Sequence, residues 1–268
     1  MADLLVDTPL EGVTRITFNR PATLNAFTSA MLEELLALFG ALAHDLSSRV
    51  VVLTGAGRAF SSGHDTTDHS PPPWLAPGLG PLHSSLLQNK WWARVIPAQR
   101  AMPQPVIAAI NGPVAGGALA IALGADLRVA ARSARFVNAF HTLGGSGTEL
   151  GVAWVLQRTI GPQATAEFLF TDRPIGANEA ARTGLVLRTV DDEALEDEVL
   201  GLAAGIVETQ PLGAWLTKTT LWSSLEVPSL EAAIELEGRG QILALAADDA
   251  TERRQARAEG RPPRYSGR

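Results

Sequence analysis

The chain has 268 residues, of which 46% are hydrophobic and 19% are charged, so it can bury the core of one globular α/β domain. The formal net charge is −6 and no basic stripe is present, which argues against nucleic acid as a partner. The chain has no cysteine, which excludes disulfides, thiolate metal sites and a cysteine nucleophile. The N-terminus carries acids where a signal peptide needs Lys or Arg, and no apolar run reaches the roughly 18 residues of a membrane span. We therefore expect a soluble, cytoplasmic protein with no membrane partner.

The first hundred residues are expected to alternate strands and helices. Residues 4–6 and 13–18 are typical of two strands joined by a polar turn. A helix is expected from about 29 to 45, because apolar residues recur at helical spacing. The residues of that apolar face are Met31, Leu35, Leu38 and Leu42. Residues 50–53 then form a short apolar strand that leads into a loop rich in glycine and serine, residues 54–65.

A second unit of the same design occupies residues 104–128. Val106 to Ile110 is a short apolar run with the β-branched content of a buried parallel strand. The pair Gly116-Gly117 follows, and the small apolar residues from Ala118 to Leu123 predict a tightly packed helix. Free N–H groups at such a helix start favour an anion. From this stretch alone, close packing of helix on strand is the favoured explanation of the glycine pair.

If the two loops converge, each can give one backbone N–H to a single oxygen atom. The sequence suggests His64 for the first loop and Gly117 for the second, both through their main chains. Such a pair would form a two-donor oxyanion hole.

Several motifs occur in a fixed order along the chain. Arg58 to Asp65 is followed by Ile110 to Gly117, and further matches lie at residues 19–26, 169–190 and 248–268. Each motif is moderately specific, and their order makes the combination strong. With them the chain resembles the enoyl-CoA hydratase/isomerase (crotonase) superfamily over nearly its whole length.

The resemblance implies an α/β fold, a crotonase-like spiral of stacked ββα units with a C-terminal helical region. On this interpretation residues 1–200 form the ββα core and residues 201–268 form a helical trimerisation region. The implied assembly is a homotrimer or a dimer of trimers. The implied ligand is a coenzyme A thioester as substrate, with no separate cofactor and with its carbonyl oxygen between the N–H groups of His64 and Gly117. Many members of the family have alanine where this chain has His64, and a backbone donor tolerates that change.

The carboxylates depart from the family pattern. Hydratases that resemble this chain carry two glutamates, at positions that fall here on Ala120 and Phe140, and neither of these residues can transfer a proton. Water addition needs an acid/base pair, so ordinary hydration is not expected. Glu149 aligns instead with the aspartate of some double-bond isomerases and dehalogenases of the superfamily. As a base it should be held ionised by the backbone N–H groups of the loop–helix junction. Its position is also explained by a first-turn acid that complements the helix dipole.

The expected activity is therefore an enoyl-CoA isomerase-type double-bond shift, with Glu149 as the single acid/base. A hydratase-type lyase, another acyl-CoA conversion (hydrolase, dehalogenase or decarboxylase) and a non-catalytic acyl-CoA binder remain alternatives. A dinucleotide-dependent oxidoreductase is disfavoured, because Phe60 stands where the third glycine of the fingerprint is needed. A serine hydrolase is disfavoured, because Thr148 stands where the nucleophile elbow needs glycine.

Contacts to the coenzyme A part of the substrate are implied by the resemblance for six residues, although for each basic residue taken alone solvated surface charge is the favoured explanation. These residues are Arg20, Arg58, Ala59, Ser62, Gly116 and Lys218.

Residues 64–69 contain two histidines and two aspartates, which on a helix would form a metal-binding face. Because a glycine precedes them and prolines follow, a long helix and hence a metal site are not expected. For His64 or His69, a role as a proton relay in the acyl pocket is favoured over a role as a metal ligand. Residues 66–92, rich in proline and tryptophan, are interpreted as a wall or lid over the acyl chain, or as a loop buried against a neighbouring subunit.

Overall fold

A computed structural model describes residues 2–267 except 69, 71, 73 and 76. Its main sheet has six strands in the order β1-β2-β3-β4-β6-β9. Only the β1–β2 pair is antiparallel, and the other four pairs are parallel. The strands of this sheet are β1 (Leu4–Leu10), β2 (Val13–Phe18), β3 (Val50–Gly55), β4 (Val106–Ile110), β6 (Leu127–Ala131) and β9 (Arg188–Val190).

A second, smaller sheet lies beside the first and has the order β5-β7-β8. Its strands are β5 (Val114–Ala115), β7 (Arg135–Val137) and β8 (Ile175–Gly176). The chain passes from β4 to β5 and then into a helix, and again from β6 to β7, so successive turns give one strand to each sheet. An isolated parallel bridge between Ser61 and Val114 adds the loop after β3 to the same layer. The result is the expected spiral of ββα turns.

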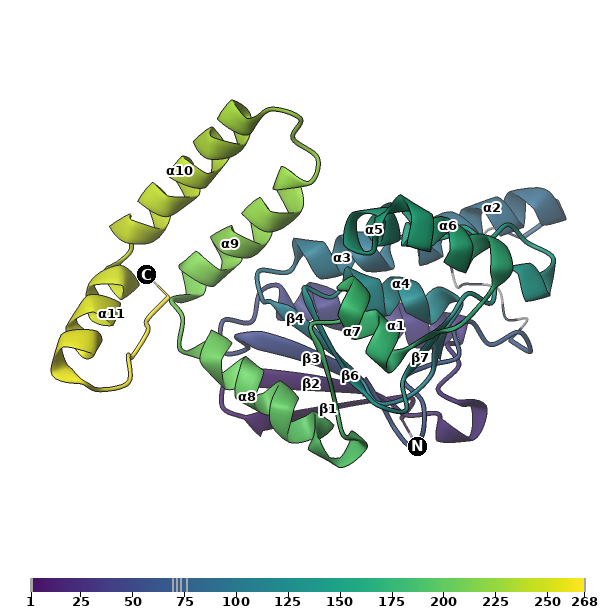
Figure 1. Cartoon of the computed structure of the whole chain (residues 1–268), viewed down its shortest axis with the longest axis horizontal. Coiled ribbons are helices and arrows are strands. Elements are labelled where there is room, and N and C mark those ends of the chain that lie inside the picture. Colours follow the sequence, from purple (N-terminus) through teal and green to yellow (C-terminus); the bar gives the residue numbers. More distant parts are fainter. Residues whose placement is uncertain (1, 69, 71, 73, 76, 268) are drawn as a thin grey trace.

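The alternation of side chains along β3 explains why helices cover both faces of the main sheet. Val50 and Val52 point to one face and pack in a cluster with residues of α8 (Leu195–Val207). Val51 and Leu53 point to the other face and belong to the large core cluster. Buried strands covered on both sides are expected to be apolar throughout, as β3 and β4 are. Figure 1 shows α8 apart from the other helices that cover the sheet.

The remaining helices of the core form the opposite layer and frame the loops after β3 and β5. They are α1 (Ser29–Leu42), α2 (Pro81–Trp92), α3 (Val95–Ala101), α4 (Gly117–Gly124), α5 (Val152–Thr159), α6 (Gly161–Thr171) and α7 (Ala177–Thr183). Short 3-10 turns occur at Pro21–Thr23, His141–Leu143 and Asp192–Ala194.

The C-terminal region consists of α9 (Pro211–Ser224), α10 (Leu230–Ala246) and α11 (Asp248–Glu259). In Figure 1 these helices extend away from the sheet as an arm that ends in yellow. The arm is joined to the core through α9, where Trp222 Nε1 donates a hydrogen bond of 2.6 Å to Asp126 Oδ1. The expected division at residue 200 falls inside α8, which packs on the sheet, so the core extends to the end of that helix.

The ends of two expected elements differ from the structure, and one helix was not expected. Strand β1 continues to Leu10, because its pairing with β2 resumes at Leu10–Val13 after a bulge. Helix α1 ends at Leu42 rather than near 45, and its core positions include Leu32 and Phe39. Residues 81–92 form a helix that the composition of this segment did not predict. Among the described residues, no single helix is long and apolar enough to cross a membrane; residues 192–207 and 211–224, bent by 109°, pass that test only as a pair.

Candidate active site

The loop that follows β3 is fastened by main-chain hydrogen bonds to the segment that runs from the end of β4 through β5. The amide of Phe60 donates to Pro113 O at 3.0 Å, and the amide of Ala115 donates to Ser61 O at 3.0 Å. Gly112 permits this approach, because a Cβ atom on it would lie 2.2 Å from the carbonyl oxygen of Arg58. The convergence expected from the sequence is therefore present.

The convergence brings the backbone amides of His64 and Gly117 side by side. Gly63 has φ +90°, and a Cβ on it would lie 3.0 Å from the Gly117 nitrogen. A Cβ on Gly117 would in turn lie 4.0 Å from the His64 nitrogen. Within the described part of the chain, neither amide donates to a protein acceptor, and Gly117 is the first residue of α4. Two free donors at a helix N-terminus can hold one oxygen that carries developing negative charge.

These amides lie at a cavity of about 630 Å³ whose lining includes both residues. Helix α2 supplies one wall, because its residues at intervals of three and four share one face. The lining residues of α2 are Leu82, Ser85, Leu86, Gln88, Asn89 and Trp92. Part of the 66–92 segment thus forms a wall of this cavity, in agreement with the first of its two interpretations. The second, burial against a neighbouring subunit, stays a prediction.

Glu149 lines the same cavity, but its surroundings differ from those expected. It precedes α5 by three residues, and the first turn of that helix contains no acidic residue. Its Oε1 accepts a hydrogen bond from the side-chain amide of Asn89. Burial raises the pKa of the Glu149 carboxyl, while the Asn89 hydrogen bond opposes that rise. The expectation that backbone N–H groups hold Glu149 ionised is therefore wrong.

The two positions where the family pattern has glutamates are apolar in the structure as well as in the sequence. Ala120 is fully buried within α4, and Phe140 lines the cavity with 6% of its surface exposed. Among the described residues that line the cavity, the ionisable side chains are those of Glu149 and His64.

The His64 imidazole packs edge-on against Trp92, with ring centroids 5.0 Å apart and the ring planes at 88°. Burial lowers its pKa below the usual value and so favours the neutral ring, while Asp68 and Asp65 oppose that shift. Its Nδ1 is buried and has no hydrogen-bond partner among the described residues. A proton relay through His64 stays a prediction, and His69 lies outside the described residues.

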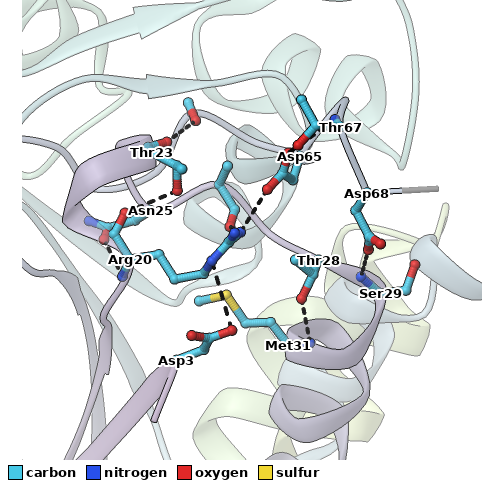
Figure 2. A network of polar contacts seen from close by, with 12 residues as sticks. Asp3, Arg20, Thr23, Asn25, Thr28, Ser29, Met31, Asp65, Thr67 and Asp68 are labelled. Atoms are coloured by element: carbon cyan, nitrogen blue, oxygen red, sulfur yellow. Dashed lines mark hydrogen bonds and ion pairs between the residues drawn. The ribbon is translucent and has the colours of Figure 1, made fainter. Parts of the chain in front are cut away.

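The two aspartates of the 64–69 segment hold the backbone in place (Figure 2). Asp65 accepts hydrogen bonds from the amide and hydroxyl of Thr67, at 3.0 and 2.7 Å, and pairs with Arg20 at 2.9 Å. Asp68 accepts from the Ser29 amide at 2.8 Å, where α1 begins. The Thr67 hydroxyl and amide, and then Arg20, lower the pKa of Asp65 to about 2.

This network predicts a stability loss in acid. Because the pKa of Asp65 is about 2 in the folded protein, below its usual value of 3.8, its stabilising contribution is complete above pH 5 and disappears as the pH falls toward 2. Asp65→Asn should lower the free energy of unfolding at pH 7 by about 1–2 kcal/mol and flatten its pH dependence below pH 5. Urea denaturation at several pH values measures the free energy of unfolding. The control is Asp197→Asn, because Asp197 is exposed. An unchanged acid slope in Asp65→Asn would contradict the assignment.

The residues expected to contact coenzyme A fall into two groups. Ser62 and Gly116 line the cavity, Ala59 is buried beside it in the first loop, and Arg58 is exposed at the same loop. Arg20 lies behind this loop, where its guanidinium is held by Asp65 and donates to Ala26 O at 2.6 Å. The structure does not bring Lys218 to this cavity.

Lys218 lies on α9 with 3% of its surface exposed. Its Nζ donates to Gln99 O at 2.7 Å and to Gln104 O at 2.8 Å, and it pairs with Asp126 at 3.1 Å. It lines a separate cavity of about 690 Å³ between α9, α10 and the sheet. With these partners the ammonium joins the helical arm to the core. A contact between Lys218 and a phosphate stays a prediction.

Asn89 lines the cavity and contacts Glu149, but the sequence did not predict it as a site residue. The spacing of Leu82, Leu86, Asn89 and Trp92 on one helical face was a usable signal, but the prolines before residue 81 obscured it.

The chain is similar to known proteins in both sequence and structure. A family model described as "Enoyl-CoA hydratase/isomerase" matches residues 9–268. A "Probable enoyl-CoA hydratase echA12" of Mycobacterium bovis is 40% identical over 98% of this chain and 92% of its own length. The "1,2-epoxyphenylacetyl-CoA isomerase" of Escherichia coli is 32% identical over the full length of both chains. The crystal structure of a probable enoyl-CoA hydratase/isomerase from Mycobacterium abscessus superimposes with a TM-score of 0.92 at 37% identity, covering 100% of both chains, so the expected fold class is confirmed.

Proposed function

Because this chain belongs to the enoyl-CoA hydratase/isomerase family, we propose that it is an acyl-CoA enzyme that shifts a double bond by moving one proton. The proposal is supported by two adjacent amides without a protein acceptor and one carboxyl group at the same cavity, counted among the residues that the structure describes. A double-bond shift needs one base that later returns its proton, whereas hydration needs groups that also position water. Ala120 and Phe140 offer no second carboxylate.

In this mechanism Glu149 removes a proton from a carbon next to the double bond of a 3-enoyl thioester. The electrons move onto the thioester oxygen, and the amides of His64 and Gly117 donate hydrogen bonds to the oxygen as it becomes an enolate. Protonated Glu149 then returns the proton to the γ-carbon, and the double bond comes to lie between the α- and β-carbons. The raised pKa of Glu149 makes it a stronger base than an exposed glutamate and stabilises its protonated form between the two transfers.

Hydration is the second candidate, because a relative with 40% identity is named as a probable hydratase. It requires a water molecule activated by Glu149 alone. Incubation of the purified protein with a 3-enoyl-CoA and, separately, with a 2-enoyl-CoA distinguishes the two activities. Conversion of the 3-enoyl thioester to the 2-enoyl thioester without water addition supports isomerisation. Hydration of the 2-enoyl thioester with no isomerisation would identify a hydratase instead. Binding of both thioesters without conversion would identify a non-catalytic acyl-CoA binder.

Ligand class is predicted independently of turnover. Coenzyme A thioesters should raise the melting temperature, whereas NAD and ATP should not, because the two amides and the cavity suit a thioester carbonyl. A ligand at about 100 times its dissociation constant stabilises the fold by about 2.7 kcal/mol, which corresponds to roughly 5–10 °C for a chain of this size. Thermal unfolding with each ligand tests this. A shift with NAD and none with an acyl-CoA would contradict the proposed ligand class.

The assembly is also proposed from family membership, as a homotrimer or a dimer of trimers. Helices α9 and α10 expose several large apolar side chains in the single chain, which supports contact with neighbouring copies. These residues include Trp215, Leu221, Leu230, Ile234, Ile242 and Leu243.

A further inference from the structure

We infer that Asn89 is a positioning residue for Glu149, holding the carboxyl group in place from the opposite wall of the cavity. This inference rests on the proposed acid/base role of Glu149 and adds the group that orients it.

The contact joins two separate walls. Asn89 lies in the last turn of α2, and Glu149 lies in the loop before α5. The two residues are 60 positions apart in the sequence, and both line the cavity. Asn89 Nδ2 donates to Glu149 Oε1, while Oε2 has no hydrogen-bond partner among the described residues. One carboxylate oxygen is therefore fixed and the other remains available to a substrate.

Fixing one oxygen matters because a glutamate side chain has three rotatable bonds and would otherwise sample many positions. Holding a base within reach of the proton it removes contributes directly to the rate. The backbone beside Glu149 is also constrained, since Leu150 and Gly151 both have positive φ values, 53° and 86°. The backbone of the loop thus restrains the main chain at Glu149, and the side-chain amide of Asn89 restrains its carboxyl group.

The same hydrogen bond affects the charge of the base. Burial raises the pKa of Glu149, and the donor from Asn89 stabilises the ionised form and limits that rise. Without the donor the pKa rises further, so a smaller fraction of Glu149 is ionised at a given pH. The acid limb of the kcat/KM profile then moves to higher pH.

A purely structural role for Asn89, as an anchor for α2, makes a different prediction. In that case, replacing Asn89 would lower stability or weaken substrate binding and leave the pKa of Glu149 unchanged. Asn89 is itself exposed, so its replacement is compatible with folding. Ser84, on the same helix but outside the cavity lining, provides the matched control.

The test compares Asn89→Ala, Asn89→Gln and Ser84→Ala with the unaltered protein. The pKa of the Glu149 side-chain carboxyl is followed by ¹³C NMR, with its signal identified by its loss in Glu149→Gln. Steady-state kinetics with a 3-enoyl-CoA are measured across the pH range. Asn89→Ala should raise the pKa of Glu149, move the acid limb to higher pH and lower kcat roughly ten- to a hundredfold with little change in KM. Asn89→Gln, which keeps an amide donor, should recover part of the loss, and Ser84→Ala should behave as the unaltered protein.

The NMR titration separates the failure of this inference from the failure of the proposed function. If Asn89→Ala leaves the pKa of Glu149 and the pH profile unchanged, Asn89 does not position Glu149. If Glu149→Gln is fully active while Asn89→Ala still shifts the pKa of Glu149, the contact stands and the catalytic role of Glu149 falls. A rise in KM alone, with kcat unchanged, would also overturn the inference, because it would assign Asn89 to binding.

Discussion

Glu149→Gln should reduce kcat by about 10²–10⁴-fold while the dissociation constant for a saturated acyl-CoA stays within a few-fold. Glutamine preserves the shape of the side chain and can still accept the hydrogen bond from Asn89, but it cannot take up a proton. If Glu149 served only to complement the dipole of α5, its loss would cost about 0.3–1 kcal/mol of stability and no rate. These two outcomes differ enough for a single variant to decide between them.

The measurements are kcat, the acyl-CoA dissociation constant and the melting temperature for both proteins. Glu34→Gln, an exposed position on α1, is the control and should match the unaltered protein in all three. In the unaltered protein kcat/KM should fall as the pH falls through the pKa of Glu149, because only the ionised form is a base. Since that pKa is raised, the fall should begin at a higher pH than an exposed glutamate would produce. Full turnover in Glu149→Gln would remove this residue from the mechanism.

The second large effect concerns hydration. Crotonyl-CoA should be hydrated at least about 10²–10⁴-fold more slowly than by an enzyme with two catalytic glutamates, since Ala120 and Phe140 cannot activate water or protonate carbon. The rate of loss of the conjugated double bond measures this directly. A parallel reaction with a 3-enoyl-CoA shows that the preparation is active. Hydration at the rate of a two-glutamate enzyme would mean that another group supplies the missing proton transfer.

The parts of the fold that the sequence predicted are those encoded locally. Strands β3 and β4 were identified by short, wholly apolar runs, and α4 by a glycine pair followed by small apolar residues. The convergence of the two loops also followed, because parallel neighbouring strands deliver their carboxyl ends to the same edge of a sheet. Gly112 and Gly63 are required there by close backbone contacts, which explains why a glycine-rich pattern indicated the site.

The parts that escaped prediction depend on contacts between distant residues. Helix α2 follows a proline-rich segment and has a mostly exposed surface, so neither propensity nor periodicity indicated it clearly. The partner of Glu149 is a side chain 60 residues away, and its pKa depends on burial by elements that the sequence does not place. Lys218 illustrates the same limit, because its burial beside Asp126 depends on how α9 docks on the core.

The central claim, that Glu149 moves a proton on a thioester enolate, is tested most directly by proton NMR of a 3-enoyl-CoA in deuterated water. The unaltered protein should convert it to the 2-enoyl thioester, with deuterium entering only to the extent that protonated Glu149 exchanges with solvent, and Glu149→Gln should do so about 10²–10⁴-fold more slowly. Equal conversion by both proteins, or a 3-hydroxyacyl-CoA as the first product, would contradict it.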